Sequence, residues 1–193
     1  LLCRNTSRKG RLQMNETIDR LRDDCCVKQK KGLHFIVASV FIWSAVLLIH
    51  SSSLPIESKN LFTFCCSAPL MPLAYMISKI IKVDFQNKSN PLTSLGIIFS
   101  VGQMPYLLIA MWIFSASPEN MLMVYAMIFG AHLLPYGWLY KSKTYYILSA
   151  MIPIATLIAG MKFSSAYVSI LMLCTEIIFC ICLVIENKKP KML

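Results

Sequence analysis

Six long apolar blocks, separated by short polar connections, constrain the fold of this chain more than any other feature. Each block is close to the ~20 residues that an α-helix needs to cross the ~30 Å hydrocarbon layer of a membrane. No water is present there to pair with backbone amides, so a spanning segment must coil into a helix. The blocks are about Leu33–His50, Leu61–Ile81, Leu92–Phe114, Met121–Tyr140, Thr144–Met161 and Ser165–Ile185. The sequence therefore predicts an all-α polytopic membrane protein, a bundle of six transmembrane helices.

The composition agrees with a membrane protein and argues against a soluble one. Hydrophobic residues make up 56% of the chain and charged residues 15%, against about 45–50% and about 25% in soluble domains. The mean hydropathy is +0.61. A formal net charge of +10 could indicate nucleic-acid binding, but the cations lie in the tails and connections. We therefore interpret them as topology signals and expect the lipid bilayer, not nucleic acid, as the partner.

Three parts are expected: a cytoplasmic N-terminal tail over residues 1–32, the six-helix domain over 33–185 and a cytoplasmic C-terminal tail over 186–193. Ile18, Leu21 and Cys25 recur at helical spacing, which predicts a short amphipathic helix in the first tail. That tail has no apolar run and so no signal peptide. A second possible start lies at Met14, and we expect residues 1–13 to precede the natural start.

The distribution of positive charge predicts the orientation. If the N-terminus is inside, seventeen of the nineteen Lys and Arg residues fall on the inner side, and only Lys59 and Lys162 fall outside. This is a strong positive-inside bias, so both termini are predicted to be cytoplasmic. Aromatic rings favour the headgroup region, and five flank the inner turn at Lys141–Lys143: Tyr136, Trp138, Tyr140, Tyr145 and Tyr146. His34 and His50 are expected at the two interfaces.

Three polar side chains lie at matching depth in the apolar blocks. Gln103, His132 and Glu176 are each about twelfth in their block. A central acidic residue costs about 2.5–3.5 kcal/mol on insertion scales and needs a partner. We expect Glu176 and His132 to pair, with Gln103 nearby, as a site for a proton, an ion or a small polar ligand. The alternative is that they are interhelical hydrogen bonds, worth about 0.6 kcal/mol each.

Prolines are expected to kink the predicted helices. They interrupt four blocks, at Pro69, Pro72, Pro105, Pro135 and Pro153. Helices broken at mid-depth often line substrate cavities in transporters, although proline also serves packing in membrane helices. GQMPYLL in the third block and GAHLLPYG in the fourth both place a polar residue shortly before Pro-Tyr, which suggests a degenerate repeat.

These features favour a small transporter or channel-like protein for a proton, an ion or a small polar solute. A second hypothesis is a non-transporting immunity, sensor or assembly protein that acts through helix–helix contacts. A third is an intramembrane enzyme, for which Cys174 and His132 could form a thiol–imidazole pair. The spans contain no G-x-S-x-G or H-E-x-x-H motif, and the eight cysteines include no C-x-x-C pair. We therefore expect no enzyme, metal site or cofactor.

Three segments carry a family resemblance: KQKKGLHFIVAS at the first block, GQMPYLL in the third and GAHLLPYG in the fourth. With them the chain, from about Lys28 to Ile185, resembles a family of small uncharacterised multi-pass membrane proteins from bacteria. The resemblance implies a bacterial inner-membrane location. It implies no activity and no site residues.

Overall fold

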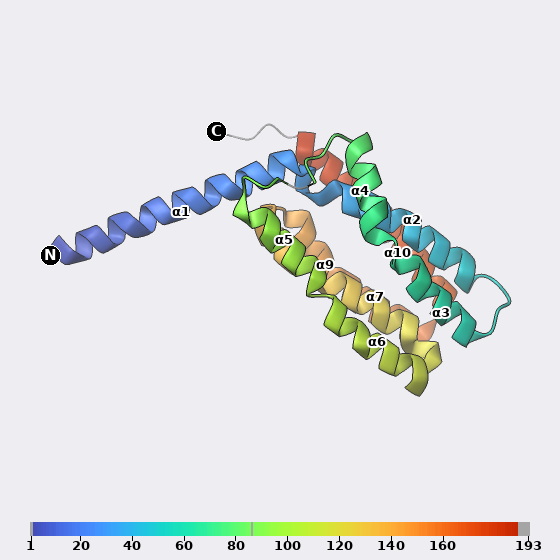
Figure 1. Ribbon diagram of the computed structural model, residues 1–193. Helices are drawn as coiled ribbons and strands as arrows, with labels where there is room; N and C mark the ends of the chain where they lie inside the picture. The colour runs from blue at the N-terminus through green and yellow to red at the C-terminus, as the bar shows by residue number, and fades with distance from the viewer. Residues whose placement is uncertain (1, 86, 189–193) are drawn as a thin grey trace.

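The computed structural model describes residues 2–85 and 87–188, and it describes side chains from residue 12 onward. Most of the expected C-terminal tail, residues 189–193, lies outside the described part. Within it the chain is helical, with short 3₁₀ turns η1 (Lys30–Gly32) and η2 (Pro118–Asn120). The helices are α1 Leu2–Lys28, α2 Leu33–His50, α3 Ile56–Ser67, α4 Leu70–Ile80, α5 Pro91–Val101, α6 Met104–Ala116, α7 Met121–Ala131, α8 Leu134–Leu139, α9 Lys143–Lys162 and α10 Ser165–Lys188 (Figure 1).

The helices make a multi-pass membrane protein with five or six candidate spans. Five segments are long and apolar enough to cross a membrane: Lys30–His50, Pro91–Ala116, Pro118–Leu139, Lys143–Lys162 and Ser165–Lys188. The pair α3–α4, bent by 43°, would supply a sixth. The predicted bounds of Leu33–His50 coincide with α2. The second block was predicted to begin at Leu61, but its first helix, α3, begins earlier, at Ile56.

Two-residue turns break three of the predicted spans, and a proline follows each turn. A proline ring clashes with the carbonyl four residues earlier and has no N–H to donate. Accordingly, α5 ends at Val101, four residues before Pro105, and α7 ends at Ala131, four residues before Pro135. In the α3–α4 pair, α3 ends at Ser67, five residues before Pro72. By contrast, α9 runs through Pro153 as one helix.

The breaks in GQMPYLL and GAHLLPYG have the same backbone hydrogen bonds. The Gln103 N–H donates to Ser100 O (3.3 Å), and the Leu133 N–H donates to Gly130 O (3.2 Å). One turn later, the Tyr N–H of each motif donates to the second residue of its turn, at 3.1 Å in both cases. The similarity suggested by the two sequences therefore extends to their local structure.

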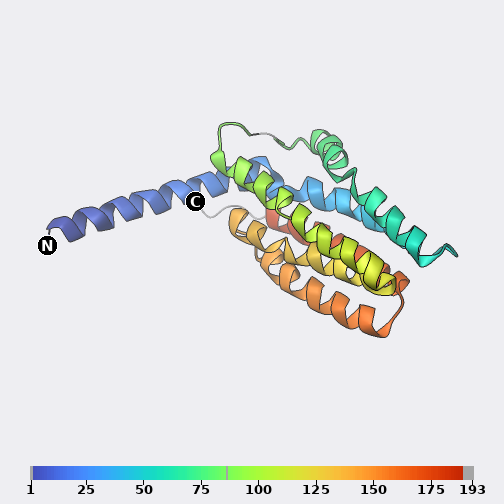
Figure 2. The same cartoon turned by 60° about the horizontal axis from the view of Figure 1, so that its bottom comes forward.

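The centre of the bundle consists of α2, α7, α9 and α10. Here α2 packs on α10, and α7 packs closely on α9. A Cβ atom added at Gly130 would lie 2.6 Å from Cγ2 of Ile152, so the absence of a side chain there permits the close approach of the two helices. The α3–α4 pair packs on α2, and the α5–α6 pair packs on α7 and α8, so these two pairs flank the centre (Figure 1). In the turned view of Figure 2 the α5–α6 pair, in yellow-green, crosses in front of the bundle.

One end of the bundle gathers most of the positive charge. The base of α1, the α4–α5 loop, the α8–α9 turn and the end of α10 lie together there, and α1 projects beyond the bundle (Figure 1). The described chain places Lys28, Lys82, Lys141 and Lys188 at this end. The opposite end, with the α2–α3, α6–α7 and α9–α10 connections, carries Lys59 and Lys162.

Several aromatic and histidine side chains are more buried than expected. Tyr136, Tyr140 and Tyr145 are only 7%, 3% and 2% exposed, because the base of α1 and neighbouring helices cover them. Trp138 and Tyr146, at 39% and 43%, remain accessible. His34 and His50 lie at the two ends of α2, but protein covers both, so neither sits at an open interface. These two side chains are 2% and 3% exposed.

Candidate functional site

The three helix breaks surround one cavity of about 390 Å³. Ala68 of the α3–α4 break, Gln103 of the α5–α6 break and His132 of the α7–α8 break all line it. Most of the other lining side chains are aliphatic or aromatic and come from α2, α3, α6 and α7, among them Ile36, Trp43, Phe64, Leu107 and Phe129. Cavities of about 300–1,000 Å³ with apolar walls and a few polar groups are typical of small-molecule sites.

Gln103 and His132 bring hydrogen-bonding groups to this cavity. In the described part of the chain, the Gln103 carboxamide has no hydrogen-bond partner. His132 Nδ1 contacts the Phe129 carbonyl oxygen one turn earlier, and the ring also interacts with the Ile128 backbone, while no side chain of the described residues is bonded to it. The other polar groups at the wall are largely paired; for example, the Tyr125 hydroxyl donates to Ser67 Oγ at 2.6 Å. Gln103 and His132 are therefore the polar groups most available to a ligand.

Glu176 lies behind the cavity wall. Its side chain is 0% exposed, and its Oε1 atom has no hydrogen-bond partner. Its Oε2 atom forms a short hydrogen bond with the hydroxyl of Ser39, which itself lines the cavity. The Ser39 hydroxyl also lies 2.8 Å from the Ile36 carbonyl oxygen. A single hydroxyl thus separates the buried carboxyl from the space that Gln103 and His132 face.

The expected pairing of Glu176 with His132 is not formed. Among the described residues, no hydrogen bond or ion pair joins the two, since Ser39 is the partner of Glu176 and the Phe129 carbonyl is the partner of His132. The depth of the two residues was predicted from sequence, but their direction around the helix axis was not. Cys174 is exposed on α10, and no hydrogen bond links it to His132, so the thiol–imidazole pair has no geometric support.

Tyrosines close the charged end of the cavity. The Tyr140 hydroxyl donates to Gln29 Oε1 at 2.8 Å, and the Tyr145 hydroxyl donates to the Lys31 carbonyl at 3.0 Å. Gly32 has φ of 72°, and a Cβ there would lie 2.9 Å from the Tyr145 hydroxyl. A glycine is needed both for this left-handed backbone and for the close approach of the rings. The segment that follows α1 therefore seals the cavity on this side.

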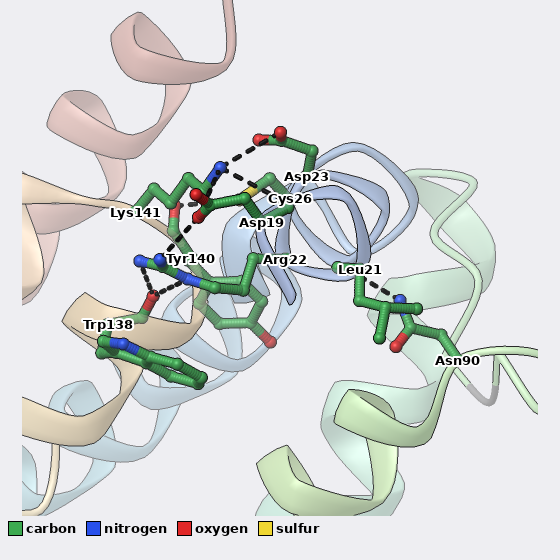
Figure 3. A network of polar contacts seen from close by, with 9 residues as sticks. All are labelled: Asp19, Leu21, Arg22, Asp23, Cys26, Asn90, Trp138, Tyr140 and Lys141. Atoms are coloured by element: carbon green, nitrogen blue, oxygen red, sulfur yellow. Dashed lines mark hydrogen bonds and ion pairs between the residues drawn. The ribbon is translucent and has the colours of Figure 1, made fainter. Parts of the chain in front are cut away.

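A polar network holds the base of α1 against that seal (Figure 3). Nε and Nη2 of Arg22 donate to the Trp138 carbonyl at 2.8 and 2.6 Å, and the guanidinium lies 4.6 Å from the centre of the Trp138 ring. Lys141 forms ion pairs with Asp19 and Asp23 at 3.3 and 3.1 Å. Charged hydrogen bonds of this kind are worth about 1.5–3 kcal/mol, so Arg22 contributes to holding α1 in place.

The opposite face of α1 is bonded to the α4–α5 loop. Asp24 Oδ2 accepts hydrogen bonds from Asn87 (2.7 Å) and Asn90 (2.9 Å), and its Oδ1 pairs with Lys28 at 2.9 Å. The bonds from Asn90 and Lys28 hold the pKa of Asp24 below its ordinary value of 3.8. On the same helix, burial raises the pKa of the Cys25 thiol to about 11, so it stays protonated at neutral pH.

Two parts of this site were not predicted from the sequence: the partner of Glu176 and the buried tyrosine cluster. Ser39 carried no signal, because serine is common in membrane helices and nothing in α2 marks it as the partner of Glu176. Tyr136, Tyr140 and Tyr145 carried a signal that was read as an interfacial belt. Their spacing around a turn covered by α1 could have indicated a buried cluster, but only with knowledge of where α1 lies.

A family model matches residues 18–186. The chain belongs to DUF7010, a family of unknown function. The resemblance to an uncharacterised family is therefore confirmed, and the match extends ten residues further toward the N-terminus than expected, into α1. No curated protein and no solved structure matched this DUF7010 chain.

Proposed function

We propose that this protein crosses the membrane six times, with α3–α4 as a broken second span and both termini in the cytoplasm of a bacterial cell. The charge asymmetry supports this orientation, because the end that carries α1 holds most of the lysines and the opposite end holds Lys59 and Lys162. Membrane-impermeant thiol labelling of the single-cysteine variants Ser58→Cys and Ser89→Cys tests it, because Ser89 is an exposed residue of the α4–α5 loop at the α1 end. We expect labelling from outside only at position 58; the reverse pattern would refute the orientation.

We further propose that the protein is a small proton-coupled transporter. The observation that carries this proposal is the connection from the buried Glu176 carboxyl, through the Ser39 hydroxyl, to the cavity lined by Gln103 and His132. An ionisable residue inside the membrane is a functional-site hypothesis by default, because such residues mark ion and proton pathways. Broken helices meeting at mid-depth are a recurrent way to build a substrate site.

In this mechanism Glu176 carries the proton and the cavity carries the solute. A hydroxyl has one proton, so when Ser39 donates to the Ile36 carbonyl, its bond with Glu176 requires the carboxylic acid as donor. Loss of the Glu176 proton through Ser39 would leave a charge with one partner in an apolar surround, which is unfavourable. Proton release and solute binding would therefore influence each other across the Ser39 hydroxyl.

Currents from proteoliposomes on a solid-supported membrane test this proposal. The compounds applied are a panel of small alcohols, amines and carboxylic acids under an imposed pH gradient. We expect at least one compound to give a current that depends on the gradient, that Glu176→Gln abolishes and that Glu119→Gln, a matched change in an exposed connection, leaves intact. Loss of one ligand hydrogen bond in Gln103→Ala should weaken apparent affinity about five-fold.

The contact-based alternative makes the opposite prediction. If the protein is an immunity, sensor or assembly protein, none of the compounds gives a current or shifts the unfolding temperature. Glu176→Gln and His132→Ala then change only the stability of the bundle. That result would refute the transport proposal.

A further inference from the structure

We propose that the cavity takes its ligand sideways from the bilayer, between α3–α4 and α5–α6, and that the ligand is a single-chain amphipath with one neutral hydrogen-bonding group. This rests on the ligand-binding role proposed above for the cavity and names the class of molecule. Four residues carry the argument: Ala68, Met71, Val101 and Met104.

These four residues line the cavity and are also exposed on the outside of the bundle. Met71, Val101 and Met104 are 42%, 58% and 56% exposed. Ala68 and Met71 belong to the α3–α4 side, and Val101 and Met104 belong to the α5–α6 side. Since α4 packs inward on α2 and α6 packs inward on α7, the two pairs leave an opening between them at their breaks.

The opening lies at the middle of both helix pairs. The α3–α4 break is twelve residues from Ile56 and about as far from Ile80, and the α5–α6 break is similarly central between Pro91 and Ala116. At 1.5 Å per residue this is roughly 18 Å from either end. An opening at that depth faces lipid tails, not headgroups or water. A molecule entering there must already be dissolved in the hydrocarbon.

The lining matches such a molecule. Among the described residues, no Asp, Glu, Lys or Arg side chain lines the cavity. Its walls are hydrocarbon and aromatic rings, and its most available hydrogen-bonding groups are those of Gln103 and His132. A volume of about 390 Å³ is near the lower limit for ligand pockets, which favours one chain over a two-chain phospholipid. The seal formed by Gln29, Tyr140 and Tyr145 leaves the side opening as the accessible route.

Trp43 allows a direct test. It is 1% exposed, lines the cavity and packs against the Tyr125 and Phe129 rings. The chain has three tryptophans, so W112F/W138F leaves Trp43 as the only tryptophan. The probe is an ω-brominated long-chain alkanol added to vesicles that contain the protein, because bromine quenches tryptophan on contact. Phosphatidylcholine brominated near the ends of its acyl chains is the comparison probe. The positive control is the W43F/W138F variant, whose remaining tryptophan, Trp112, is 66% exposed and lies outside the cavity lining.

We expect the bromoalkanol to quench Trp43 several-fold and saturably, and an unbrominated alkanol to restore the emission. Ala68→Phe, which adds bulk at the opening, should reduce this quenching, whereas Met76→Phe, on the lipid face of α4 outside the cavity, should not. Brominated phosphatidylcholine should quench Trp112 but leave Trp43 largely unaffected. Should the double variant not fold, the difference between wild type and W43F gives the same signal.

Two results would overturn the inference. If the bromoalkanol quenches Trp112 but leaves the emission of Trp43 unchanged, the cavity has no side entrance. Trp43 quenched equally by the brominated phospholipid, without saturation, means that an ordinary bilayer chain fills it. Either can occur while the proposed transport currents persist, and saturable quenching can occur without any current, so the two proposals fail separately.

Discussion

Replacing Glu176 with methionine should stabilise the protein while removing its proposed function. The substitution deletes a fully buried carboxyl whose Oε1 atom has no partner, and an unsatisfied buried polar atom costs about 1–3 kcal/mol. It also deletes the bond to Ser39, for which membrane hydrogen bonds average about 0.6 kcal/mol. Ser39 retains the Ile36 carbonyl as a partner, so no new unpaired group is created. The expected net gain is about 1–2 kcal/mol.

Equilibrium unfolding in mixed detergent–SDS micelles measures this change, and the proteoliposome current measures the function. Glu176→Gln is the matched control, because it keeps the size and the bond to Ser39 but holds no acidic proton. We expect it to change the free energy of unfolding by less than the methionine variant and to abolish the current equally. Higher stability with lost activity is the pattern expected where a residue is kept for function at a cost in stability.

A clear destabilisation by Glu176→Met would refute this reasoning. It would mean that the carboxyl contributes more to the bundle than its single bond to Ser39 indicates. Unchanged currents in both variants would instead remove Glu176 from the proton pathway. The two readouts therefore separate an error about packing from an error about function.

Three further predictions concern the rest of the molecule. Gly130→Ala should lower the free energy of unfolding by about 1–3 kcal/mol, since the new Cβ would lie 2.6 Å from Ile152. Gly96→Ala is the control: its Cβ meets only a Leu139 methyl group at 3.2 Å, so the free energy of unfolding should change by less than about 0.5 kcal/mol. Arg22→Ala removes about 1.5–3 kcal/mol of charged hydrogen bonding. It should therefore raise the rate of maleimide labelling of the buried Cys25 and Cys26 about ten-fold or more. Arg20→Ala, which makes the same charge change on the exposed face of α1, should leave that rate unchanged. The folded-state pKa of Asp24 is lowered, so the contribution of its carboxylate to the free energy of unfolding should be complete above pH ~4 and lost as the pH falls through that lowered pKa. Asp24→Asn should therefore make the melting temperature depend less on pH between pH 6 and pH 3. A variant whose melting temperature falls with pH as steeply as that of the wild type would contradict this assignment.

The helical class could be predicted from sequence because hydrocarbon leaves the backbone no alternative. The bounds of α2 were predicted correctly, since polar residues mark both of its ends. The breaks were also signalled, because proline acts locally on the carbonyl four residues earlier. Pro153 shows the limit of that reasoning: the same residue type is accommodated within the continuous helix α9.

The composition of the site was only partly accessible from sequence. Gln103 and His132 do line one cavity, but the pairing of His132 with Glu176 required knowing which way each side chain faces around its helix. That direction depends on how α10 packs against α2, which is a property of the whole bundle. The partner that Glu176 does have, Ser39, lies on a helix with no other unusual feature.

The link between α1 and α2 keeps the two helices mechanically separate. The three residues of this link have left-handed φ angles: 45° at Lys30, 52° at Lys31 and 72° at Gly32. The helix is therefore interrupted between α1 and α2, and a tilt of α1 does not force α2 to tilt. A shift of α1 would therefore not be passed on to α2, and Ser39 and Trp43 would keep their places at the cavity wall.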